Sequence, residues 1–180
     1  MKNIKVFVLA LVTFLPIISC AQQRVIGPVI ENYGAVFSVE NPDFKTDPNI
    51  EYKVIFDIHD SPEDPSVLNP ILNTLARFLN MHAQAGVPLK NLKVACVFHN
   101  KATWDAVNNE AYKEKYGVDN PNEPLMEALD KVGAEMYICG QSVYARGVDR
   151  ERLAEPVKVG LSAMTVILSK EAEGYRLIKF

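Results

Sequence analysis

The architecture of this chain follows from one short stretch, Met136-Tyr137-Ile138-Cys139-Gly140-Gln141-Ser142-Val143-Tyr144. It continues an apolar run that begins at Ala134, and it ends in small polar residues. An apolar run followed by Cys-Gly-Gln-Ser predicts a buried strand that turns directly into a helix. Cys139 then lies at the carboxyl end of the strand, where backbone N–H groups and the helix dipole favour the thiolate.

Outward from this stretch, apolar runs alternate with amphipathic or polar segments. Strands are expected at residues 52–58, 92–98, 134–138, 157–161 and 175–180, and the last alternates enough to be an edge strand. Helices are expected at residues 65–86, 102–116, 124–132, 141–146 and 162–172. This alternation predicts a flavodoxin-like, three-layer α/β/α domain with a mostly parallel sheet of about five strands.

The parallel sheet gives a meaning to the spacing of three chemically active residues. His59, His99 and Cys139 each follow a predicted strand, and each lies 40 residues after the one before. The segments between them share no pattern, so the spacing reflects the length of a strand–helix unit rather than a repeat. Because the carboxyl ends of parallel strands lie at one edge, where ligands bind, we expect two imidazoles and one thiol at the same mouth.

Cys139 is the strongest candidate for chemistry, as a thiolate nucleophile or a sulfur carrier. The alternative is a buried structural cysteine that packs as a small apolar residue. His99 precedes Asn100, and it is placed either to hydrogen-bond a thiolate or anion or to cap the following helix. His59 lies in a polar turn and has the same two interpretations, a site residue or a solvated loop residue. Arg146, Arg150 and Arg152 follow Cys139 closely enough for one of them to reach the mouth and lower the pKa of its thiol, although solvated surface is the simpler interpretation for all three.

The other cysteine of the predicted domain, Cys96, lies between Ala95 and Val97 inside a strand and is expected to be structural. Its position makes a disulfide with Cys139 improbable, since bridging needs nearby Cα atoms and converging side chains. The three histidines and the cysteines do not follow metal-site spacings, and no glycine-rich phosphate motif occurs. The sequence therefore implies neither a metal nor a cofactor.

The first 20 residues predict a secretory signal rather than part of the fold. Lys2 and Lys5 precede an apolar stretch from Val6 to Ile18, which is short for a membrane-spanning helix. Residues 15–20 resemble a bacterial lipoprotein signal, which implies cleavage before Cys20, lipidation of that cysteine and a periplasm-facing protein anchored only by its lipid. Ordinary cleavage near Ala21 is the alternative. Residues 21–50 are expected to be a tether with a short edge strand at 35–39, ahead of the domain at 51–180.

Composition excludes several classes of partner. Hydrophobic residues make up 48% of the 180-residue chain, which is ample for one core, and the formal net charge is −3. That charge gives no footprint for nucleic acid. No basic cluster suggests binding to an anionic membrane surface.

At three places the sequence resembles the DsrE/DsrF-like family of sulfur-relay proteins. These are residues 52–58, the segment Val97-Phe98-His99-Asn100 and, most specifically, Ile138-Cys139-Gly140-Gln141-Ser142; residues 30–36 resemble the leader of exported members. The resemblance covers about residues 28–180. It implies a flavodoxin-like fold that assembles into trimers or hexamers, and a persulfide carried on Cys139 and passed to a partner. The best-understood members are cytoplasmic, whereas this chain carries an export signal.

Three hypotheses follow for the function. In the first, the protein is an envelope sulfur carrier or a sulfurtransferase-like protein, whose partners are a sulfur donor and acceptor, either proteins or small sulfur compounds. Cys139 accepts the sulfur, the N–H groups of Gly140, Gln141 and Ser142 stabilise the persulfide, and His99, with His59, supplies hydrogen bonds or a proton. In the second, an oligomeric module binds a small anionic or thiol ligand at the same mouth without turnover. In the third, both thiols are packing residues.

Overall fold

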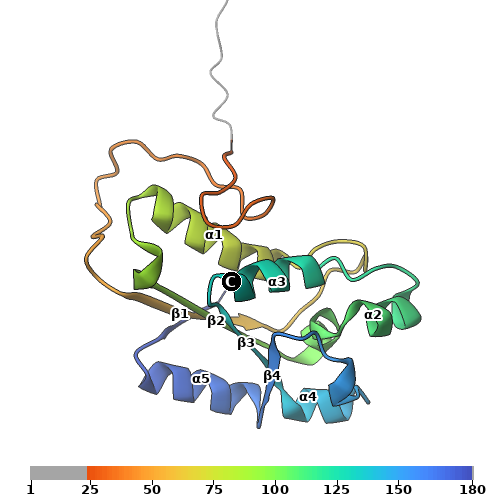
Figure 1. Cartoon of the computed structure of the whole chain (residues 1–180). Coiled ribbons are helices and arrows are strands. Elements are labelled where there is room, and N and C mark those ends of the chain that lie inside the picture. The colour runs from red at the N-terminus through yellow and green to blue at the C-terminus, as the bar shows by residue number, and fades with distance from the viewer. Residues whose placement is uncertain (1–23, 180) are drawn as a thin grey trace, which may run out of the picture.

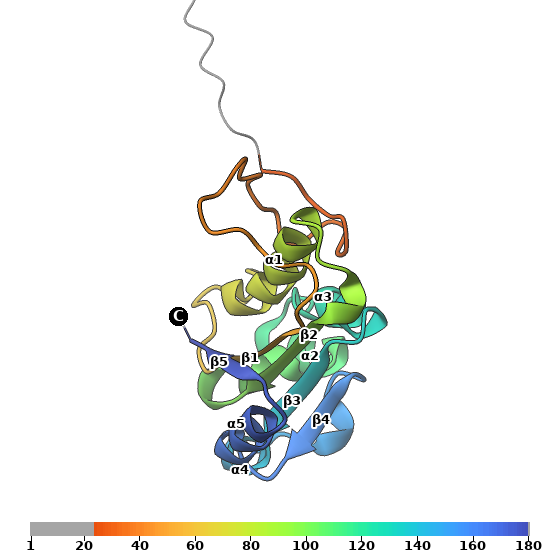
Figure 2. The ribbon, with the colours of Figure 1, turned by 90° about the vertical axis from the view of Figure 1, so that its left-hand side faces the viewer.

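A five-stranded parallel sheet organises the part of the chain that the computed structural model describes, residues 24–179. The strands are β1 (Tyr52–Ile58), β2 (Leu92–Phe98), β3 (Glu135–Cys139), β4 (Val157–Gly160) and β5 (Arg176–Ile178). Their order across the sheet is β4-β3-β2-β1-β5, and every neighbouring pair is parallel (Figure 2). The predicted α/β architecture is confirmed, with β5 at an edge.

Helices cover both faces of the sheet and complete the three layers (Figure 1). Helices α1 (Pro70–Gln84), α2 (Asn109–Tyr116) and α3 (Glu123–Lys131) lie on one side, while α4 (Gly140–Ala145) and α5 (Ala163–Ala172) lie on the other. Short 3-10 helices occur at Leu89–Asn91, Asn100–Ala106 and Arg150–Arg152. Alternate strand residues therefore enter two separate cores, and Phe56, Cys96 and Ile138 face a different layer from Ile55, Val97 and Cys139.

Capping residues explain where helix boundaries differ from the expected ones. The helix expected from residue 65 begins at Pro70, because the side chain of Asn69 accepts hydrogen bonds from the amides of Ile71 and Leu72. The helix expected at 102–116 is instead two elements. Residues 100–106 form a 3-10 helix, and α2 starts after Asn108, whose side chain accepts from the amide of Ala111.

The N-terminal extension is fastened to α1 mainly by the buried side chain of Asn80, with one further hydrogen bond each between the side chains of Asn73 and Gln84 and the extension. Its Oδ1 accepts from the amides of Val29 and Ile30 at 3.0 and 2.8 Å, and its Nδ2 donates to the carbonyls of Ile30, Tyr33 and Gly34. The extension adds no strand to the sheet. The edge strand expected at 35–39 is wrong, since Val36 forms only an isolated antiparallel bridge.

The predicted signal segment and the predicted lipidation site Cys20 lie outside the described residues. Between residues 24 and 179, no helix is long and apolar enough to cross a membrane.

One carboxylic acid lies inside the core near the end of β1. Asp105 is 2% exposed and accepts hydrogen bonds from the side chains of Asn69 (2.6 Å) and Ser61 (2.9 Å). Burial raises the pKa of Asp105 to about 6, and the two hydrogen bonds only partly oppose this effect. Because the folded-state pKa exceeds the usual value of 3.8, Asp105 costs stability when it ionises.

We expect Asp105→Asn to remove a pH dependence of folding. Well below pH 3.8 the acid is protonated in both states and costs nothing, and the cost builds up as pH rises from about 4 to about 6, above which the native protein has lost about 3 kcal/mol from this group. The neutral amide has nothing to ionise, so its free energy of unfolding should exceed that of the wild type at pH 7 but not at pH 4. Urea unfolding at both pH values measures this difference, with the exposed Asp130→Asn as control. An equal difference at both pH values would contradict the prediction.

Candidate active site at the carboxyl edge of the sheet

The register of the sheet brings the three predicted site residues level with one another. Ile58 is paired with Phe98, and Phe98 with Ile138. His59, His99 and Cys139 are the next residues of β1, β2 and β3, and the amide of His99 still donates to the carbonyl of Ile58 at 2.9 Å. Neighbouring strands lie about 4.8 Å apart, so the three residues form a row with His99 in the middle.

His99 makes a close contact with a buried carboxylate that was not among the predicted site residues. Its Nε2 lies 2.6 Å from Oδ1 of Asp57, whose side chain is 7% exposed. The other carboxylate oxygen, Oδ2, lies 3.2 Å from Nζ of Lys179, which follows β5. Because a carboxylate only accepts hydrogen bonds, Asp57 holds the His99 ring with its proton on Nε2. The imidazole keeps 28% of its side chain exposed to solvent.

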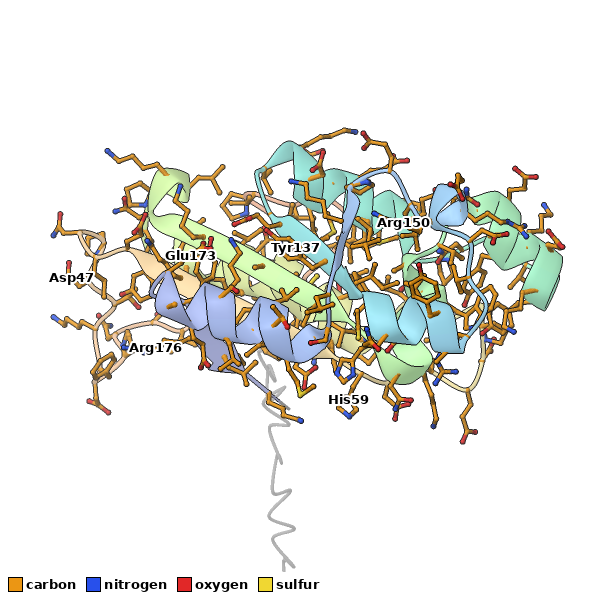
Figure 3. All side chains as sticks on the ribbon, turned by 90° about the horizontal axis from the view of Figure 1, so that it is seen from below. Asp47, His59, Tyr137, Arg150, Glu173 and Arg176 are labelled. Atoms are coloured by element: carbon orange, nitrogen blue, oxygen red, sulfur yellow. The ribbon has the colours of Figure 1, made fainter. Side chains whose placement is uncertain are left out.

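His59 lies beside His99, at the β1 end of the row. The ring centroids are 6.0 Å apart. Figure 3, which looks at the sheet from the side of α4 and α5, shows His59 near the place where these two helices lie end to end. Its Nδ1 is buried and has no hydrogen-bond partner within residues 24–179. Buried polar atoms are usually satisfied, so this nitrogen is available to a bound group.

Cys139 collects hydrogen bonds from two different helices. Its side chain is a member of the core on the α5 side, and the residue is 6% exposed. Burial raises the pKa of the thiol, but hydrogen bonds from the Ser142 hydroxyl and from the amides of Ser142, Ala163 and Gln141 outweigh burial and lower the pKa below its ordinary value. The thiolate is therefore favoured, as expected from the strand-to-helix turn. Neither imidazole is among these hydrogen-bond partners.

The amide of Gly140, which was expected to contact the sulfur, is likewise absent from these partners. Gly140 has another role, because a Cβ atom there would lie 2.7 Å from the carbonyl oxygen of Gly160. Only glycine allows α4 to start this close to β4. The side-chain amide of Gln141 donates to the carbonyl of Leu161 at 3.4 Å, so only the backbone N–H of Gln141 donates to the thiol.

Asn100 connects the loop after β2 to α4. Its backbone adopts a positive φ of 51°, which asparagine tolerates, and its amide donates to the hydroxyl oxygen of Ser142 at 3.2 Å. Its side-chain oxygen accepts from Nη2 of Arg146 at 2.9 Å. Arg146 therefore does reach this edge, and Asn100 orients the hydroxyl that contacts Cys139.

The second cysteine of the domain, Cys96, lies outside this site. Cys96 is fully buried within β2, and burial raises the pKa of its thiol far above the usual value. Cys96 and Cys139 are both free thiols. Residues 24–179 contain no group of histidine, cysteine and carboxylate side chains arranged to hold a metal ion.

Three contributors to the site were missed by the sequence analysis: Asp57, Lys179 and the amide of Ala163. Asp57 carried a signal, since an acidic residue inside an apolar strand is unusual and needs a partner. The amide of Ala163 carried none, because it depends on where α5 begins in space.

The fold and this edge define a class of protein. It is a parallel α/β domain that presents a thiolate-favouring cysteine at a strand-to-helix turn, next to an Asp–His pair.

The chain belongs to the DsrE/DsrF-like family, whose model matches residues 53–180. This membership suggests a function related to sulfur relay. No curated protein matches the chain. Two solved structures share the fold: MTH1491 from Methanobacterium thermoautotrophicum, a protein of unknown function, and the ychN protein from E. coli. Their TM-scores are 0.55 and 0.51, with 20% and 15% identity. Each comparison covers 72% of this chain, and 100% and 99% of the respective structures.

We expect Ser142→Ala to make Cys139 harder to deprotonate. The substitution removes the hydroxyl that stabilises the thiolate, and a hydrogen bond to a charged group is worth about 1.5–3 kcal/mol, so the pKa of the thiol should rise by about one unit or more. The measurement is the pH midpoint of Cys139 alkylation by iodoacetamide, followed by peptide mass spectrometry. Ser142→Thr keeps a hydroxyl and serves as the control. An unchanged midpoint in Ser142→Ala would contradict the assignment.

Proposed function

We propose that this protein is an exported, lipid-anchored sulfur carrier with sulfurtransferase-like chemistry, which holds sulfur as a persulfide on Cys139. The observation that carries the proposal is the set of donors around the thiol, namely one hydroxyl and three amides from α4 and α5. These donors favour the thiolate, which is the form of Cys139 that attacks a sulfane sulfur during loading and that leaves during release. Family membership supports the same chemistry at a coarser level.

Loading needs no cofactor. The Cys139 thiolate attacks a sulfane sulfur of a donor such as a polysulfide, forming one S–S bond. The S–S bond within the donor breaks, and the departing sulfur keeps the electron pair. A sulfur atom is thereby transferred, with no external oxidant or reductant.

The proposed location and assembly have separate support. The lipoprotein-type signal ending at Cys20 supports an envelope protein anchored by its lipid, on the periplasmic side. The α4–α5 side exposes four large apolar side chains, Tyr144, Leu161, Met164 and Leu168, each at least 67% exposed. Met164 and Leu168 lie one turn apart on α5, Leu161 lies just before the start of that helix, and an exposed apolar patch of this kind is typical of a protein interface. We propose that it joins copies of this chain into a homotrimer or hexamer, which would cover the outer surface of the α4–α5 layer.

A second function is favoured by the low exposure of the thiol. At 6% exposed, Cys139 suits a pocket floor as well as a reaction centre. The protein would then bind a small anionic or thiol ligand at the same edge without turnover. In that case Cys139→Ala would retain ligand binding, whereas a carrier loses its function altogether.

We expect Cys139→Ser to abolish sulfur loading while leaving the thermal midpoint nearly unchanged. After polysulfide treatment, the intact mass of the wild type should rise by one sulfur atom, which peptide mapping places on Cys139 and a reductant removes. Cys96→Ala should still load, because its thiol lies in the other core. Persistent loading of Cys139→Ser would refute the carrier proposal.

We expect Leu168→Glu to break the proposed assembly. A carboxylate in the centre of an apolar interface would lose its hydration, and this cost should shift the protein from oligomer to monomer. Light scattering coupled to size-exclusion chromatography gives the mass directly. Lys131→Glu, on the exposed end of α3, is the matched control on the opposite face. An oligomer that survives Leu168→Glu would exclude this surface as the interface.

A further inference from the structure

We propose that Asp57 and His99 act together as the proton shuttle that moves sulfur from Cys139 to a thiol acceptor. Asp57 is the positioning residue, and His99 is the group that reaches the reacting atoms. The inference rests on the proposed persulfide function and adds to it the step that unloads the carrier. It also assigns the acceptor a chemical class, a thiol that is protonated when it arrives.

The geometry of the pair supports this division of roles. The 2.6 Å contact of Nε2 with the buried Asp57 carboxylate, itself held by Lys179, fixes the ring orientation and places the imidazole proton on Nε2. With the proton on Nε2, Nδ1 is the nitrogen of the His99 ring that can accept a proton. With 28% of its side chain exposed, the ring can be approached from solvent, as a base must be.

The row of strand ends places the backbones of His99 and Cys139 side by side. Residues 99 and 139 are neighbours on β2 and β3, with backbones about 4.8 Å apart. The thiol of Cys139 has its own hydrogen bonds and makes none with His99. A persulfide extends the side chain by one S–S bond of about 2 Å, so the outer sulfur lies beyond the donors that hold the inner one. The pair is therefore placed for the loaded state rather than the empty state.

Unloading needs such a proton shuttle. A persulfide held as an anion has a negatively charged outer sulfur, which repels an attacking thiolate. The acceptor thiol, for its part, arrives protonated and is a poor nucleophile. If His99 removes this proton and passes it to the outer sulfur, the acceptor becomes a thiolate and the outer sulfur loses its negative charge. The acceptor thiolate then forms a bond with the outer sulfur, the S–S bond to Cys139 breaks, and Cys139 leaves with the electron pair as a thiolate. The acceptor departs as a protonated persulfide, and His99 is neutral again.

The hydrogen-bond donors that favour the attacking Cys139 thiolate during loading also favour its departure during unloading. Stabilisation of the Cys139 thiolate by Ser142, Gln141 and Ala163 makes Cys139 a good leaving group. Other charged or titratable side chains around the pair belong to neighbouring elements. They are His59 beside the ring, the ion pair of Lys101 with Asp60, and Arg146 through Asn100. None of them contacts Asp57, so the Asp57–His99 contact can be tested separately.

The test separates loading from unloading in a single turnover. The purified protein is loaded with polysulfide and desalted, and is then chased either with N-acetylcysteine or with a water-soluble phosphine. The phosphine takes the outer sulfur but has no proton to lose, so it reports how much accessible sulfur is present. Mass spectrometry of the Cys139 peptide follows each chase.

We expect His99→Gln to slow transfer to the thiol about tenfold or more, as for loss of an acid–base group. Asp57→Asn should slow it about threefold or more, because the amide oxygen can still accept from Nε2 but carries no charge. Loading and phosphine capture should stay within about twofold of the wild type in both variants. Asp60→Asn removes a nearby exposed carboxylate that does not contact His99, and it should transfer normally.

A spectroscopic measurement adds a readout that a purely structural role would not move. Imidazole ¹⁵N spectra of the wild type should show His99 protonated at Nε2 and bare at Nδ1, and this single tautomer should be lost in Asp57→Asn. Normal loading with thiol transfer within twofold of the wild type in both variants would overturn the shuttle alone. Absence of loading on wild-type Cys139 would overturn the proposed carrier function as well.

Discussion

The register between β1, β2 and β3 is the constraint on which the site depends. Parallel strands put their carboxyl ends at one edge, but only exact pairing of Ile58 with Phe98 and of Phe98 with Ile138 puts the next three residues level. A slip of one residue in β2 would turn His99 to the opposite face and carry it away from both Asp57 and Cys139. Buried alternation of apolar side chains on two faces prevents that slip, because each face packs into a different core.

The site combines two kinds of electrostatic support that have different origins. The thiol is served by backbone amides and one hydroxyl, whose positions are set by where two helices begin. The imidazole is served by a buried carboxylate from a neighbouring strand, which is balanced by a lysine beyond β5. The thiol and the imidazole are thereby held by separate groups, so a change of charge on one leaves the hydrogen bonds of the other in place.

Much of this arrangement could be predicted from the sequence, for identifiable reasons. Strands and helices follow from apolar periodicity, and the 40-residue spacing of His59, His99 and Cys139 becomes meaningful once the sheet is taken as parallel. The depressed thiol pKa follows from the strand-to-helix turn. The amide of Ala163 could not be predicted, because local sequence does not say that α5 begins against β3. The close start of α4 at Gly140 likewise depends on the carbonyl of Gly160, which is 20 residues away in the chain. The observed start of a helix differs from the start predicted by apolar periodicity where a side chain caps the helix, as Asn69 does for α1.

The fastening of the N-terminal extension by Asn80 has a mechanical consequence. For a chain anchored at Cys20, only three residues separate the anchor from Arg24, where the described chain begins, and Val29 and Ile30 are already bonded to Asn80. An extended chain spans at most about 3.6 Å per residue, so the anchor point lies within a few nanometres of α1. Any pull from the bilayer would reach the domain first at α1, through the hydrogen bonds that Asn80, Asn73 and Gln84 make with the extension. The domain would therefore be held close to the bilayer, attached through α1 rather than through the strand ends that carry Cys139.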